Sequence, residues 1–186
     1  MDLLLDVFSK KFTSAYCGAD KGHWEAALWA SRVVGKYERG ATMVMAKATG
    51  VKVDTIEDHA HAYNLFQELC DLSLEHRKFT FAARRAPFIH YSHFRAIYDA
   101  REKYQLSTQE CFSILMDIVQ AEGELSSRDV DTHAQGRYGK EPSWEYHAQK
   151  AQRELSKTLL KLPHDKSLME GKQILQQAFD WIGDNV

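Results

Sequence analysis

The residues best suited to binding chemistry form a basic stretch, which we define as Arg77 to Arg95. It carries no acidic residue, and aromatic side chains and histidines alternate with its cations. Its basic residues are Arg77, Lys78, Arg84, Arg85 and Arg95, and its rings are those of Phe79, Phe81, Phe88, His90, Tyr91 and His93. Cations neutralise phosphates and rings pack on sugars or bases, so this pattern indicates a nucleic-acid surface. The alternative is a loop whose aromatics are buried and whose arginines are merely solvated.

A helix-turn-helix pattern precedes the basic stretch, in residues 42–61. Ala46, Gly50 and Ile56 have the spacing of that motif. The small alanine lets the second helix cross close to the first, and the glycine can adopt the left-handed conformation of the turn. The isoleucine then points back under the first helix. Such a helix pair can present its second helix to the major groove of DNA.

The second helix of this pattern carries both the predicted base-reading residues and an excess of acid. Lys52, Thr55 and His61 are predicted to face base edges. Three carboxylates lie on or near the same outward face and oppose a polyanion, namely those of Asp54, Glu57 and Asp58. The first two have the spacing of a capping box, and acids favour a helix N-terminus. Either the basic stretch supplies most of the affinity, or the corner binds another protein.

Two short segments further along resemble the DNA-binding core of ParB-type partition proteins. Residues 91–97, YSHFRAI, resemble the Ser-His helix start with its apolar-Arg-Ala-apolar continuation that follows the helix-turn-helix in that family. Residues 124–130, ELSSRDV, resemble the family's later Ser-x-Arg-x-apolar step. The order of the three motifs matches over about residues 42 to 133. The family's arginine-rich nucleotide-binding box is not recognisable here, so only the DNA-binding core is carried over.

The resemblance implies that Ser92, His93 and Arg95 lie near the phosphate backbone. The whole predicted DNA-binding set is Lys52, Thr55, His61, Arg84, Arg85, Ser92, His93, Arg95 and Arg128.

Two histidine pairs and one polar cluster could suggest metal or nuclease chemistry: His59 with His61, His90 with His93, and the group Arg128, Asp129, Asp131 and His133. Residues two apart on a helix point in different directions, and the second pair straddles a helix start. Within the cluster, Asp129 and His133 also have the i, i+4 spacing of an ordinary ion pair. The sequence has no glycine-rich phosphate loop and no nucleophile elbow. We therefore predict no catalytic residue, metal or cofactor, and a metal-dependent nuclease or hydrolase is the weaker alternative.

Helical periodicity dominates the elements that must position these residues, and no alternating strand pattern of useful length appears. We predict an all-α chain whose helices include 24–37, 54–74, 142–162 and 167–182 and others beginning at Ser92, Ser107 and Ser126. The glycines and proline of the loop at 136–142 mark a boundary. Residues 1–139 then form a multi-helix DNA-binding core that contains the helix-turn-helix. Residues 140–186 form a C-terminal helical hairpin, either packed on that core or used for homodimerisation.

Composition limits the class of protein. The 186 residues are 44% hydrophobic and 27% charged, which is typical of a globular chain. The net charge of −2 means that any nucleic-acid face must be local. The cysteines, Cys17, Cys70 and Cys111, lack metal-ligand spacing and are interpreted as reduced core thiols in a cytoplasmic protein. The opening residues are apolar for too short a run to be a signal peptide or a membrane span.

Together these features predict a cytoplasmic, sequence-specific double-stranded DNA-binding protein. We expect a transcriptional regulator of bacterial, phage or plasmid origin that acts as a homodimer. The alternative is a helical protein–protein interaction module, of the kind a phage uses as a modulator, that binds through the acidic helix at 54–61.

Overall fold

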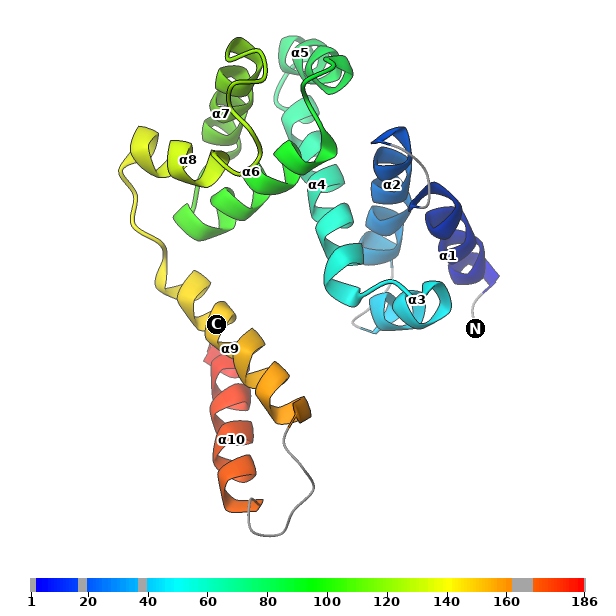
Figure 1. Ribbon diagram of the computed structural model, residues 1–186, viewed down its shortest axis with the longest axis vertical. Helices are drawn as coiled ribbons and strands as arrows, with labels where there is room; N and C mark the ends of the chain where they lie inside the picture. The colour runs from blue at the N-terminus through cyan, green and yellow to red at the C-terminus, as the bar shows by residue number, and fades with distance from the viewer. Residues whose placement is uncertain (1–2, 17–19, 37–39, 162–168, 186) are drawn as a thin grey trace. The chain divides into compact units, whose positions relative to one another are not determined.

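The computed structural model describes residues 3–16, 20–36, 40–161 and 169–185, and within these ranges the chain is all-α, as predicted. The described helices are α1 (Leu3–Tyr16), α2 (Asp20–Lys36), α3 (Ala41–Thr49), α4 (Val53–Asp71), α5 (Leu74–Arg85), α6 (Tyr91–Tyr104), α7 (Thr108–Gln120), α8 (Val130–Tyr138), α9 (Trp144–Lys161) and α10 (Met169–Asn185) (Figure 1). The chain divides into two compact units. Unit 1 comprises 1–101 with 106–139, and unit 2 comprises 102–105 with 140–186.

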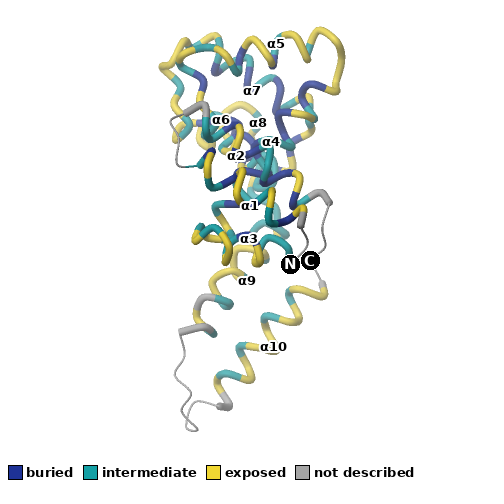
Figure 2. Tube along the Cα trace, turned by 90° about the vertical axis from the view of Figure 1, so that its right-hand side faces the viewer, coloured by how far each residue is buried: buried dark blue, intermediate teal, exposed yellow. Residues whose placement is uncertain are grey.

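Helix α4 is the central element of unit 1. It packs along α2 and also contacts α3, α5 and α7, while α1 packs on α2 and α3. The core between the first four helices includes Phe12, Val33, Met45, Ile56 and Ala60, all without exposed surface (Figure 2). Burial of this apolar surface holds α3 and the first half of α4 in place.

The helix boundaries test several local predictions. Ser107 forms the predicted capping box, because its Oγ accepts from the Glu110 N–H at 3.2 Å and its own N–H donates to Glu110 Oε2 at 2.7 Å. The capping box predicted at Asp54 is wrong, since α4 begins one residue earlier and has Lys52 as its N-cap.

Two further boundaries differ from the prediction. The helix predicted from Ser126 begins later, at Val130, because the Ser126 N–H and hydroxyl both donate to the Asp129 carboxylate and form a turn. The first part of the basic stretch is the helix α5 and not a loop.

Unit 2 is a hairpin of the antiparallel helices α9 and α10 with residues 102–105 beside it. The Ser143 N–H donates to the Lys103 carbonyl at 2.8 Å, and the Gln152 amide donates to the Phe179 carbonyl at 3.3 Å. Among the α9 and α10 side chains whose exposure is described, none is fully buried (Figure 2).

Two other sequence predictions can be placed in the fold. Cys70 and Cys111 are buried free thiols, as predicted, and Cys17 lies outside the described residues. None of the helices described is both long and apolar enough to cross a membrane.

Candidate nucleic-acid interface

The corner between α3 and α4 has the geometry that the spacing of Ala46, Gly50 and Ile56 predicted locally. Helix α3 ends at Thr49, Gly50 has φ of 72° in the left-handed region, and its N–H donates to the Ala46 carbonyl at 2.9 Å. Helix α4 begins three residues later, at Val53. Ile56 is fully buried, so an apolar contact fixes the second helix under the first.

Both helices of this corner begin without a side-chain cap. The N-cap residues, Gly40 of α3 and Lys52 of α4, make no side-chain hydrogen bond to the first turn. The first N–H groups of a helix have no partner within the helix, and they carry a partial positive charge. A phosphate oxygen is a suitable acceptor for such groups.

The side chains exposed at the corner are mainly basic or apolar. Lys47 and Lys52 are exposed, and so are Met43 and Val44 on α3. Asp54 is the exposed carboxylate of the first turn of α4. The corner therefore presents two cations and one anion to solvent.

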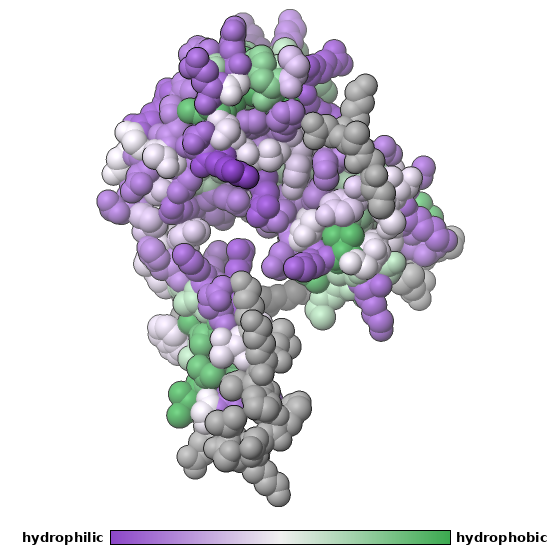
Figure 3. Space-filling model, in the orientation of Figure 1, coloured by the Kyte–Doolittle hydropathy of each residue, from purple (hydrophilic) through white to green (hydrophobic). Residues whose placement is uncertain are grey.

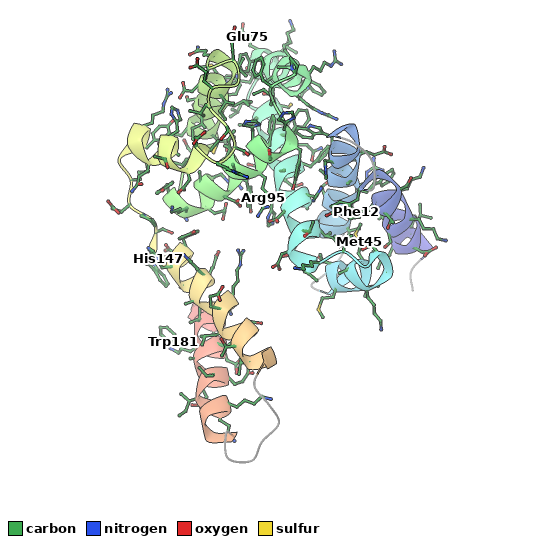
Figure 4. All side chains as sticks on the ribbon, in the orientation of Figure 1. Phe12, Met45, Glu75, Arg95, His147 and Trp181 are labelled. Carbon is green, nitrogen blue, oxygen red and sulfur yellow. The ribbon has the colours of Figure 1, made fainter. Side chains whose placement is uncertain are left out.

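The carboxylate of Asp58 is neutralised within unit 1. Arg95 of α6 places Nη2 3.0 Å from Asp58 Oδ2 and Nε 3.5 Å from Asp99 Oδ2 (Figure 4). The Asp58 side chain is 24% exposed and that of Arg95 is 44% exposed, so the pair is only partly screened by water. The ion pair reduces the net negative charge that the second helix presents. It also means that Arg95 is engaged by two carboxylates of the same unit.

A cluster of aromatic rings surrounds the buried side chain of His59, the residue after Asp58 on α4. His59 is 3% exposed, and its ring stacks on Tyr91 of α6 with centroids 4.5 Å apart. It also meets the edges of Phe12 and Tyr16 from α1, at 5.7 and 5.5 Å. His23 of α2 completes the cluster, because its Nδ1 lies 3.2 Å from His59 Nε2. We call these five rings the histidine cluster. They connect helices α1, α2, α4 and α6.

The partners of His59 assign its protons. Its Nδ1 lies 2.7 Å from the Thr55 carbonyl, which can only accept, so this nitrogen carries the proton. Its Nε2 is then an acceptor, and His23 Nδ1 donates to it. Burial lowers the pKa of His59 from 6.5 to about 4, opposed by the Thr55 hydrogen bond and assisted by His23 and Arg95. Burial also raises the pKa of the Tyr91 hydroxyl. The His59 imidazole is therefore neutral at physiological pH.

The remaining residues predicted to read bases are less exposed than Lys52. Thr55 is half-buried, and its carbonyl is engaged by His59. His61 is half-buried and stacks on Tyr98 of α6, with centroids 4.4 Å apart and planes 12° apart.

Helix α5 separates the predicted phosphate ligands by face. Arg84 lies over the rings of Trp24 and Phe66, 4.6 and 5.2 Å from their centroids, so its charge is held by cation–π contacts. Lys78 and Arg85 are exposed two helical turns apart on the outer face of α5. Phe81 lies between them and is 41% exposed. The outer face of α5 thus combines cations with an aromatic ring.

Lys52 precedes the start of α4, whereas Arg85 lies on α5, which follows the end of α4. Val53 to Asp71 spans roughly 27 Å at 1.5 Å per residue, with the α3–α4 corner at one end and α5 at the other. The structure therefore does not bring Lys52 and Arg85 into one cluster.

The residues implied by the ParB resemblance differ in accessibility. Ser92 is half-buried, whereas His93 is 4% exposed and its Nδ1 accepts from the His90 N–H at 3.0 Å. Burial lowers the pKa of His93. Arg128 is exposed in the turn before α8. His93 thus belongs to the interior of unit 1, and Arg128 to its surface.

The polar cluster near α8 is an ion-pair network. His133 Nε2 lies 2.8 Å from Asp117 Oδ2 of α7, and Arg137 pairs with the same carboxylate. Asp129 instead accepts from Ser126, so the predicted Asp129–His133 pair is wrong. Among the described residues, no group of three or more histidine, cysteine or acidic side chains is arranged to hold a metal ion.

Sequence reasoning missed the histidine cluster. His23 and His59 are 36 residues apart, and no local spacing joins them. The useful signal was the histidine on the apolar face of α4, one turn after Thr55, which required a buried polar partner.

Comparison of the chain with protein-family models, curated proteins and solved structures finds no match in any of the three.

Proposed function

We propose that this chain binds double-stranded DNA in a sequence-specific manner through the α3–α4 corner, as a cytoplasmic transcriptional regulator of bacterial, phage or plasmid origin. The observation that carries the proposal is the three-residue connection itself. A left-handed Gly50 joins two helices whose contact is fixed by the buried Ile56, while the start of the second helix is exposed. A helix start held in this way is what a major groove accommodates. The order of the downstream segments resembles that of ParB-type proteins, although His93 and Arg95 are engaged within unit 1.

The electrostatics of the corner support this proposal further. Two exposed lysines flank the turn, and the uncapped start of α4 adds partial positive charge beside it. The Asp58–Arg95 pair removes one of the carboxylates that oppose a polyanion. We therefore assign phosphate contacts to Lys47 and to the start of α3, and base reading to Lys52 and Thr55.

The alternative of a protein partner on the acidic helix at 54–61 has less support. Of the charged residues in that range, only Asp54 is exposed, and Asp58 is already paired. Protein recognition by this segment would need more accessible acid than it presents.

Fluorescence anisotropy with a labelled duplex pool at several salt concentrations tests the DNA proposal. The double variant Lys47→Ala, Lys52→Ala should weaken binding to every duplex and reduce the slope of log K against log salt by about 1 to 2. The double variant Lys10→Ala, Lys11→Ala removes the same number of exposed lysines from α1 and serves as the matched control. Equal salt slopes in this control and in the Lys47→Ala, Lys52→Ala variant would contradict the assignment of Lys47 and Lys52.

A further inference from the structure

The outer side of α5 carries apolar and basic side chains in a single row. Leu74 and Phe81 are 66% and 41% exposed, and Lys78 and Arg85 are exposed as well. At 100° per residue these four positions lie within an arc of about 60°, and at 1.5 Å per residue they extend over roughly 16 Å of helix. We call them the outer row. Apolar and basic side chains alternate along it.

The opposite side of α5 is fixed against the rest of unit 1. Thr80 and Ala83 are buried, and the rings of His76 and Phe79 lie 4.2 and 5.3 Å from that of Phe112 on α7. Helix α5 lies at one end of unit 1, with its outer side exposed (Figure 2). Hydrophobic and hydrophilic side chains lie next to one another over this end in Figure 3. The outer row therefore faces away from the interior of unit 1.

The charges of the outer row are not neutralised by the described part of the chain. Neither Lys78 nor Arg85 has an ion pair or hydrogen bond with another described residue. Arg77 on the flank of the row is paired with Asp71 at 2.9 Å, so that pair adds no net charge. Glu75 is the only acid in the sequence of α5, and it lies about 90° around the helix from the middle of the row. A partner of the outer row must therefore bring negative charge.

The mixture of side chains indicates which kind of anionic partner fits. Protein–protein interfaces are depleted in lysine, and their charges gather at the rim, whereas Lys78 lies between Leu74 and Phe81. A nucleic acid would engage the cations and the ring. It would leave Leu74 and Leu72, the latter 37% exposed, against sugar and phosphate. The row instead fits a partner that has anionic and apolar groups in adjacent layers.

The shape of α5 agrees with this conclusion. Its exposed residues cover an arc of about 160° at 100° per residue, so the outer row is the crest of a convex surface. They are Leu74, Glu75, Arg77, Lys78, Phe81, Ala82 and Arg85. A lipid surface adapts to a convex helix, because such a helix enters the boundary between headgroups and acyl chains. Lysine and arginine lay their aliphatic stems along the apolar side chains while their charged ends reach the phosphates.

We propose that the outer row of α5 binds the surface of a membrane that contains anionic phospholipid. Surface binding of this kind needs no membrane-spanning helix. With two cations and two exposed apolar side chains in the row, the binding is weak, reversible and dependent on anionic lipid. The surface is separate from the α3–α4 corner, so the proposal does not rest on DNA binding.

Flotation of the full chain with lipid vesicles tests this proposal. The wild type should float with vesicles of phosphatidylcholine and phosphatidylglycerol, should not float with phosphatidylcholine alone, and should dissociate as salt is added. Lys78→Gln with Arg85→Gln should reduce partitioning at least about tenfold, since each cation near an anionic surface contributes about fivefold. Lys150→Gln with Arg153→Gln removes one exposed lysine and one exposed arginine from α9 and should float as the wild type does.

The apolar part of the row has its own test. Leu74→Ser should weaken partitioning at least about fivefold and leave its salt dependence unchanged, because an exposed leucine enters the lipid without adding charge. Leu74→Met keeps an apolar side chain and should bind as the wild type does. Circular dichroism and urea unfolding check that every variant keeps its fold.

Three results would overturn the proposal. These are a wild type that does not float with anionic vesicles at low salt, equal flotation with neutral vesicles, or a Lys78→Gln, Arg85→Gln variant that floats as the α9 control does. If vesicles are not bound but a single-stranded oligonucleotide is, and this variant loses it, the partner is a nucleic acid. Lys47→Ala with Lys52→Ala should float normally, so failure of membrane binding and failure of DNA binding are distinguishable.

Discussion

Removing the buried histidine of α4 should reduce the pH dependence of stability in a calculable way. Unfolded His59 binds a proton below about pH 6.5, whereas burial lowers the pKa of folded His59 to about 4. Between these values the unfolded state holds more protons, so the free energy of unfolding falls as the pH falls. The contribution of His59 is complete above pH 6.5 and is lost progressively down to about pH 4.

The magnitude follows from the two pKa values. Lowering the pH from 7.5 to 5 should cost about 2 kcal/mol of unfolding free energy through His59 alone, since each pKa unit corresponds to about 1.4 kcal/mol. Burial also lowers the pKa of His93. Because His93 is present in both the wild type and a His59 variant, it does not affect the difference between them. The main physical cause is burial, which withholds water from the charged imidazolium, and the nearby His23 and Arg95 lower the pKa further.

Urea unfolding of the wild type and of His59→Asn at pH 7.5, 6.5, 5.5 and 5 measures this effect. Asparagine keeps an N–H near the Thr55 carbonyl but cannot titrate, so the variant should be less stable at pH 7.5 and should lose less stability on acidification. His147→Asn, which removes an exposed histidine from α9, should follow the wild type. If wild type and His59→Asn lose the same free energy between pH 7.5 and 5, the proton assignment and the role of burial are both refuted.

Four further substitutions test the fold and the corner. Gly50→Ala should lower the free energy of unfolding by about 1 kcal/mol. Gly50 has φ of 72° and no atom lies within 4 Å of an added Cβ, so the cost is purely conformational. Gly136→Ala, inside α8 with equally open space, should instead be neutral or stabilising by up to about 1 kcal/mol in the same urea experiment. Phe12→Ala should cost about 3 to 5 kcal/mol because its side chain has no exposed surface, and a loss under about 1 kcal/mol in thermal or urea unfolding would contradict its place in the core. Ser107→Ala should cost about 1 kcal/mol, because the hydroxyl that accepts from the Glu110 N–H and donates to its carboxylate is lost while the backbone N–H bond of residue 107 remains; Ser113→Ala, half-buried further along α7, is the control. Asp54→Asn removes the exposed carboxylate of the corner and should tighten binding to a duplex pool about two- to tenfold in anisotropy measurements, whereas unchanged or weaker binding would place DNA away from α4.

Local sequence patterns were sufficient for much of the fold. The spacing of Ala46, Gly50 and Ile56 placed a helix end, a left-handed residue and a buried contact where the structure has them. Ser107 and Glu110 gave the start of α7, because a capping box satisfies two backbone donors by local contacts alone. Such features depend on residues at most ten positions apart in the sequence.

The arrangement of charged and polar partners could not be predicted in this way. Arg95 pairs with Asp58 and Arg84 lies over Trp24, and each contact joins helices far apart in the sequence. A basic residue in the sequence is equally consistent with a phosphate ligand and with an internal cation, because tertiary packing decides its direction. His59 illustrates the same limit, since its partner His23 comes from a different helix.

Selection of DNA from a random duplex pool by the wild-type chain tests the central proposal most directly. We expect enrichment of a defined sequence, bound with an affinity that falls as salt rises, and loss of that enrichment in the Lys47→Ala, Lys52→Ala variant. If the wild type enriches no sequence and retains no duplex at low salt, the α3–α4 corner is not a DNA-binding site.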